Sequence, residues 1–65
     1  MLKNNQHNLI HQLSEISDSL WRIEKHYLDE SKSCESCVEI WRILHQDYEK
    51  HIAMLSEEIK KHIND

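Results

Sequence analysis

The stretch Asp29-Glu30-Ser31-Lys32-Ser33-Cys34-Glu35-Ser36 decides the fold, because it is the one segment of this 65-residue chain with the composition of a connection. Serine and aspartate side chains compete for backbone hydrogen bonds, so they favour turns and helix caps over helix interiors. The chain contains no glycine and no proline, the two residues that most disfavour helices. The sequence therefore predicts an all-α, single-domain hairpin over residues 1–65, with a helix over about 4–29, a turn over about 30–33 and a second helix over about 34–63.

Each expected helix carries an apolar stripe that would pack against the other helix. In the first helix the stripe recurs at alternating intervals of four and three residues: Leu9, Leu13, Ile16, Leu20, Ile23 and Tyr27. In the second helix the stripe is wider: Cys34, Cys37, Val38, Trp41, Leu44, Tyr48, Ile52, Leu55 and Ile59. These periods predict two antiparallel helices, with Ser33 as the N-cap of the second. Ser36, with Glu39 as its capping-box partner, is the alternative N-cap. A turn near residue 31 would place Trp21 level with Trp41, and His26 level with the two cysteines.

Other apolar residues fall outside the stripe of the first helix or at the edge of the second. A single exposed isoleucine is normal, but a tryptophan with several isoleucines and leucines at similar heights indicates an interface. A hairpin of this size also cannot enclose a core, since each helix has only one neighbour. We therefore expect a homodimer in the form of a four-helix bundle. The expected interface residues are Ile10, Trp21, Leu28, Ile40, Trp41 and Ile43.

Charge and hydropathy exclude several classes of function. The chain carries 8 basic and 12 acidic residues, for a net charge of -4, and the basic residues form no stripe. This distribution argues against binding to nucleic acid. No apolar run approaches the roughly 18 residues of a membrane span, and the N-terminal residues lack the apolar segment of a signal peptide. We expect a cytoplasmic protein with no membrane partner.

The size, the acidic balance and the predicted hairpin together resemble the Rop class of dimeric RNA-binding four-helix bundles. No sequence motif is shared, so the resemblance concerns architecture and carries over no functional residue. It implies RNA binding as a third interpretation, behind protein association and metal binding.

The segment Cys34-Glu35-Ser36-Cys37 places two thiols on one side of the start of the second helix. Two thiolates at this spacing can chelate one metal ion, and a tetrahedral zinc site needs two more ligands. His26 and Glu30 are the nearest candidates within one hairpin, and the cysteine pair of a second subunit is the alternative. Buried thiols that fill the turn, or redox chemistry, are competing interpretations.

The histidines divide by helix face. On the second helix His45, His51 and His62 fall near the inner face, and Glu58 pairs with His62 at a spacing of four residues. These four residues form a second set of candidate metal ligands, although histidines that are simply hydrogen-bonded within the bundle fit the same pattern. On the first helix His7 and His11 are predicted to point outward into solvent.

The sequence offers little support for catalysis, since it has no glycine-rich loop for phosphate and no pocket is expected on two helices. We expect a non-enzymatic helical-hairpin module that acts through homo-oligomerisation and partner-protein binding. The alternative is a protein that binds, stores or senses zinc or iron through Cys34, Cys37 and the histidines. Zinc or iron is the cofactor that this alternative would require.

Overall fold

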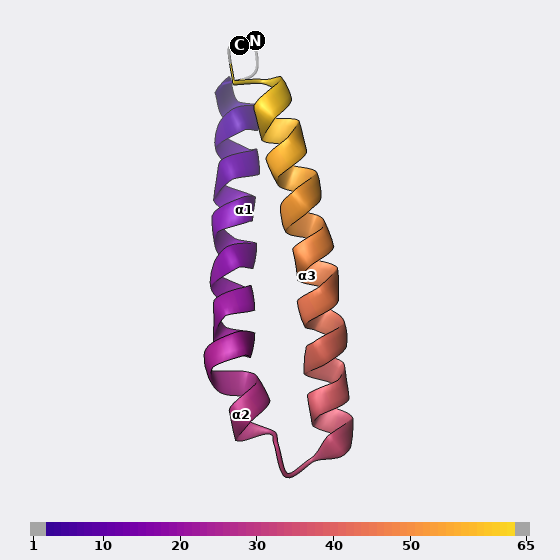
Figure 1. Ribbon diagram of the computed structural model, residues 1–65. Helices are drawn as coiled ribbons and strands as arrows, with labels where there is room; N and C mark the ends of the chain where they lie inside the picture. The colour runs from indigo at the N-terminus through magenta and orange to yellow at the C-terminus, as the bar shows by residue number, and fades with distance from the viewer. Residues whose placement is uncertain (1–2, 64–65) are drawn as a thin grey trace.

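The computed structural model describes residues 3–63 and confirms the antiparallel helical hairpin (Figure 1). The first arm is helical without interruption, through α1 (Lys3–Arg22), η1 (Ile23–Tyr27) and α2 (Leu28–Glu30). After the connection at residues 31–34, α3 (Glu35–Lys61) returns alongside the first arm. Residues 3–63 contain no strand. The molecule is a thin rod with principal extents of 49 × 15 × 12 Å.

The segment η1 is a single π-helical turn that the sequence pattern did not predict. The backbone N–H of Leu28 donates to the carbonyl of Ile23, five residues earlier, where an α-helix would use a spacing of four. The wider turn rotates the residues that follow it toward the partner helix. Leu28, which the sequence placed off the inner stripe, is therefore half-buried.

The N-cap of α3 is Cys34, so the prediction of Ser33 and the alternative of Ser36 are both wrong. Cys34 has an extended backbone, with φ -127° and ψ 101°, and its Sγ atom accepts a hydrogen bond from the backbone N–H of Cys37. A capping side chain accepts from the N–H of the second or third helical residue, and the sulfur of Cys34 accepts from the third, Cys37. Ser33 lies one residue too early, in the turn.

Three contacts across the hairpin show that its register differs from the prediction. The contacting pairs are Tyr27 with Trp41, Glu24 with His45, and Gln6 with His62. Trp41 thus lies opposite Tyr27 and not opposite Trp21, a shift of about six residues. The reason lies in the connection, where Ser31 N–H donates to the Tyr27 carbonyl and Lys32 N–H to that of Asp29. These bonds extend the first arm beyond α2, so the chain reverses nearer Cys34 than residue 31.

The interior of the rod is very small. Ile23, with 1% of its surface exposed, is the one buried side chain among the residues assigned a burial class. Other members of the two inner stripes, such as Leu13, Ile16 and Ile52, are only half-buried. Each helix covers one side of its neighbour and leaves the remaining sides in solvent, as expected of an isolated pair.

Candidate functional site

Several large apolar side chains are exposed on the surface of the hairpin. Four predicted interface residues lie outside the hairpin seam, with exposed fractions between 49% and 57%: Ile10, Trp21, Ile40 and Ile43. Met54 and Ile63 are also exposed, and the sequence reasoning missed both. Met54 follows Ile43 by 11 residues, which is three helical turns, so the helical period would have revealed it.

The other two predicted interface residues belong to the hairpin itself. Trp41 is half-buried, and its ring lies against that of Tyr27 with a centroid separation of 4.8 Å and an interplanar angle of 38°. Leu28 is half-buried after the π-turn. Trp41 and Leu28 therefore contribute mainly to contact between the arms.

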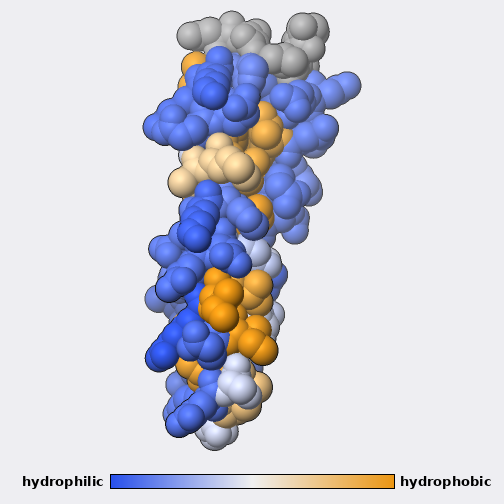
Figure 2. Space-filling view, turned by 90° about the vertical axis from the view of Figure 1, so that its right-hand side faces the viewer, coloured by the Kyte–Doolittle hydropathy of each residue, from blue (hydrophilic) through white to orange (hydrophobic). Residues whose placement is uncertain are grey.

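The exposed apolar residues of α3 and of α1 form two separate lines. Ile40, Ile43 and Met54 lie within about 60° of one another around α3, at about 90–150° from the stripe that faces α1. We call these three residues the α3 line. Figure 2 looks onto the α3 side of the rod and shows apolar surface in its upper and lower halves. Ile10 and Trp21, the α1 line, lie about 100° from the stripe that faces α3. Because the helices are antiparallel, the two lines lie on different sides of the hairpin.

The two cysteines meet at the start of α3. Their Sγ atoms lie 2.8 Å apart, and both cysteines are free thiols. Cys34 is half-buried and Cys37 is exposed, so the expectation that both thiols fill the turn as buried apolar groups is wrong. The hydrogen bond with Cys37, helped by Ser36 Oγ at 3.4 Å, lowers the pKa of Cys34 to about 7. The same contact between the thiols raises the pKa of Cys37.

The structure does not bring the predicted one-hairpin metal ligands together. The ring of His26 packs edge-on against Trp21, with centroids 5.1 Å apart. With the observed register, His26 lies about five residues further along α3 than Cys37. Within residues 3–63, no three histidine, cysteine, aspartate or glutamate side chains are placed to hold a metal ion. Neither His26 nor Glu30 therefore forms such a group with the cysteines.

His45 lies between two carboxylates. Its Nε2 atom is 3.0 Å from Glu24 Oε1 on the opposite arm, and its Nδ1 atom is 3.4 Å from Glu49 Oε1 one turn along α3. The side chain is 24% exposed, as expected for a histidine near the inner face. His51 is exposed, contrary to the inner-face prediction, and its ring lies 6.2 Å from that of Tyr48.

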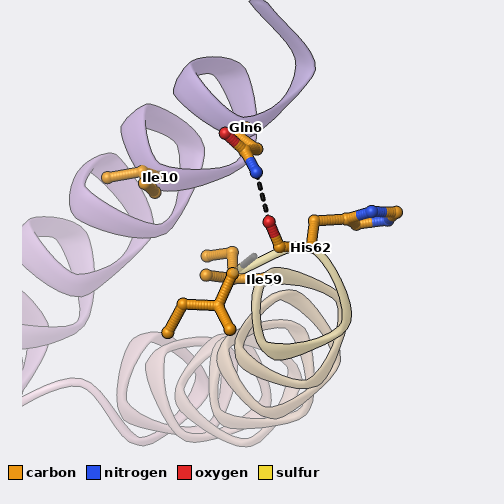
Figure 3. A pocket seen from close by; sticks show the side chains of 5 residues that line it. Gln6, Ile10, Ile59 and His62 are labelled. Carbon is orange, nitrogen blue, oxygen red and sulfur yellow. Dashed lines mark hydrogen bonds between the residues drawn. The ribbon is translucent and has the colours of Figure 1, made fainter. Parts of the chain in front are cut away.

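Glu58 and His62 form the predicted pair, with Oε2 and Nε2 2.9 Å apart. The hydrogen bond from His62 and the nearby charge of Lys61 lower the pKa of Glu58. The backbone carbonyl of His62 accepts a hydrogen bond from the side-chain amide of Gln6, which ties the end of α3 to α1 (Figure 3).

An open pocket of about 140 Å³ lies beside this contact. Its lining residues are Gln6, Ile10, Ile59, His62 and Ile63. The His62 imidazole points away from Gln6 (Figure 3). Apart from the amide and carbonyl that already bond to each other, the pocket is mainly apolar. It therefore adds apolar surface beside Ile10.

The remaining histidines lie on the outer face of α1, as predicted. The rings of His7 and His11 stack at 6.1 Å, and His11 Nε2 lies 3.5 Å from Glu15 Oε1, with both side chains 64% exposed.

No helix within residues 3–63 is long and apolar enough to cross a membrane.

No protein-family model, curated protein or solved structure matches the chain. The resemblance to the Rop class therefore rests on size, charge and hairpin architecture alone, and a shared architecture does not imply a shared function.

Proposed function

We propose that the protein is a non-enzymatic helical-hairpin module that associates with copies of itself and binds a partner protein. One observation carries the proposal. The residues with an assigned burial class include a single buried side chain, Ile23, and six large apolar side chains that are 49–74% exposed. Soluble monomers seldom expose extended apolar surface, and such surface usually marks an interaction site.

The exposed area supports an interface of ordinary size. The hairpin exposes 5122 Å², whereas a compact monomer of 7.9 kDa exposes about 4400 Å². The excess of about 700 Å² is close to the roughly 800 Å² that each partner buries in a standard protein interface. Burial of an interface of this size would reduce the exposed area of each hairpin to about that of a compact monomer of the same mass.

The division of the apolar surface into two lines supports two binding events. A two-fold dimer buries the same patch on both copies, so a dimer that covers the α1 line leaves the α3 line in solvent. The serines between Ile10 and Trp21, at positions 14 and 17, are small enough to let another helix approach closely. The α1 line, with these serines, would serve a second copy of the chain, and the α3 line would serve the partner protein.

Sedimentation over a range of micromolar concentrations tests self-association. We expect the wild-type chain to form a dimer or larger assembly, and its melting temperature to rise with concentration. In the double variant Ile10→Ser/Trp21→Ser the assembly should dissociate to monomers. The double variant Ile40→Ser/Ile43→Ser, which changes the α3 line, should still assemble.

The control is Glu39→Ser/Arg42→Ser, which changes two exposed polar residues of α3 next to Ile40 and Ile43. This control should assemble like the wild type, and circular dichroism should show the same helix content. A stably folded wild-type monomer at micromolar concentration would contradict the proposal. So would equal association of the control and both apolar variants.

A further inference from the structure

The dithiol at the start of α3 plays no part in the proposed association. Its two Sγ atoms lie 2.8 Å apart, and Cys37 is exposed to solvent. The sulfurs are thus close enough to react with each other and open enough to meet a small molecule.

The local fold holds the pair in this arrangement. The extended backbone of Cys34 turns its side chain over the first turn of α3, where Sγ accepts a hydrogen bond of 3.4 Å from the N–H of Cys37. Side chains of a helix lean toward its N-terminus, so the side chain of Cys37 leans back toward Cys34. Helix formation by α3 therefore brings the two thiols together.

We propose that Cys34 and Cys37 form a reversible dithiol–disulfide couple that exchanges with a small-molecule disulfide. The Cys34 thiolate attacks one sulfur of that disulfide, which forms a mixed disulfide and releases one thiolate. The Cys37 sulfur, after giving its proton to solvent, attacks Cys34 Sγ and releases the second thiolate. The protein loses two electrons and two protons, and the small disulfide is reduced to two thiols.

The assignment of Cys34 as the attacking sulfur follows from its contacts. Cys34 Sγ has hydrogen-bond contacts with the Cys37 thiol, the Ser36 hydroxyl and the Cys37 backbone N–H. These contacts stabilise the thiolate and agree with the lowered pKa of Cys34 and the raised pKa of Cys37. At neutral pH the reactive form of Cys34 is consequently abundant and that of Cys37 is scarce.

The separation of the sulfurs favours disulfide chemistry over metal binding. Two thiolates bound to one tetrahedral zinc ion lie about 3.8 Å apart. The observed distance of 2.8 Å is shorter, and the nearest sequence-predicted histidine packs on Trp21 instead. The pair is therefore arranged for direct sulfur-to-sulfur reaction.

Equilibration of the full chain with mixtures of reduced and oxidised glutathione tests the proposal. After acid quenching, intact mass should show the loss of two hydrogens, and peptide mapping should place one disulfide between Cys34 and Cys37. The same chain in urea is the unfolded reference. We expect the folded chain to form the internal disulfide at an oxidised-to-reduced ratio about tenfold lower than the unfolded chain.

Single variants test the order of the two steps. Cys37→Ser should accumulate a mixed disulfide with glutathione on Cys34, because no second thiol is present to displace it. Cys34→Ser should react at Cys37 about tenfold more slowly at neutral pH. The proposal is overturned if both thiols stay reduced at every ratio, or if mainly disulfides between chains accumulate. Equal rates in the two variants would overturn the role of Cys34.

Discussion

The imidazole of His45 connects the two arms of the hairpin, because its Nε2 atom lies 3.0 Å from Oε1 of Glu24. Glu24 lies within the π-turn, so the one irregular turn of the first arm also provides this contact with α3. The two side chains are 24% and 45% exposed, which makes the pair partly shielded from solvent.

A double-mutant cycle should measure the contribution of this pair. We expect His45→Ala and Glu24→Ala to show a coupling free energy of about 0.5–1 kcal/mol in chemical denaturation. The control pair is His11 and Glu15, which lie 3.5 Å apart with both side chains 64% exposed. Its coupling should be within about 0.3 kcal/mol of zero. Equal coupling free energies in the two cycles would show that the His45–Glu24 contact stabilises the hairpin no more than an exposed surface pair does.

Ile23→Ala should destabilise the hairpin more than any other single truncation in the first arm. Ile23 is 1% exposed, and loss of a fully packed isoleucine side chain costs about 2–4 kcal/mol. Ile16→Ala is the control, since Ile16 belongs to the same stripe but is half-buried. Denaturation at fixed protein concentration should show a clearly smaller loss for Ile16→Ala. Similar losses would mean that association buries Ile16 as completely as the hairpin buries Ile23.

Tryptophan fluorescence should report association directly. The chain has two tryptophans, so Trp41→Phe leaves Trp21 as the only one. Trp21 is 54% exposed in the hairpin, and its emission should move to shorter wavelength as concentration rises. Trp21→Phe, which leaves the half-buried Trp41, should show a smaller shift. Trp21→Ala should weaken association by an amount on the order of 2 kcal/mol.

Stability should rise with pH between about 7 and 9 under reducing conditions. The folded chain loses the Cys34 proton near pH 7, whereas the ordinary pKa of the thiol is 9.0. In that window the unfolded state binds more protons, so stability increases with pH. Above pH 9 the raised pKa of Cys37 acts in the opposite direction. Melting followed by circular dichroism should show this rise in the wild type and its loss in Cys34→Ser, which keeps a capping side chain.

Zinc binding, if the cysteines provide it, should not involve His26. The His26 ring packs on Trp21, and no three-ligand group forms within residues 3–63. We expect His26→Ala to leave the effect of zinc on melting unchanged. A site built from the cysteine pairs of two chains would instead lose its effect in Cys37→Ser. Loss of a zinc effect in His26→Ala would contradict the observed register.

The sequence predicted the helices well because their signals are local. The absence of glycine and proline and the period of the apolar stripes needed no information from the other arm. The register was wrong because it depends on where the chain reverses, and the bonds of Ser31 and Lys32 moved that point toward Cys34. Because the observed register differs from the predicted one by about six residues, His26 lies away from the cysteines that it was expected to join.

The exposed apolar residues were also predictable, since Ile10, Trp21, Ile40 and Ile43 deviate from a regular period. The π-turn was not predictable, because Tyr27 follows Ile23 by four residues and fits an ordinary α-helical stripe. The contact between the two thiols depends on the unusual use of cysteine as an N-cap, for which propensity favours serine.

The π-turn also marks the point where the length of the first arm can change during evolution. A π-turn contains one residue more than the α-helical turn it replaces. Loss of one residue between Ile23 and Tyr27 would close a regular turn and leave the orientation of α1 relative to α2 nearly unchanged. The same loss within Lys3–Arg22 would rotate one part of the helix by about 100° against the other and turn half of its apolar stripe toward solvent. Homologous chains that differ by one residue in this arm should therefore differ within the π-turn.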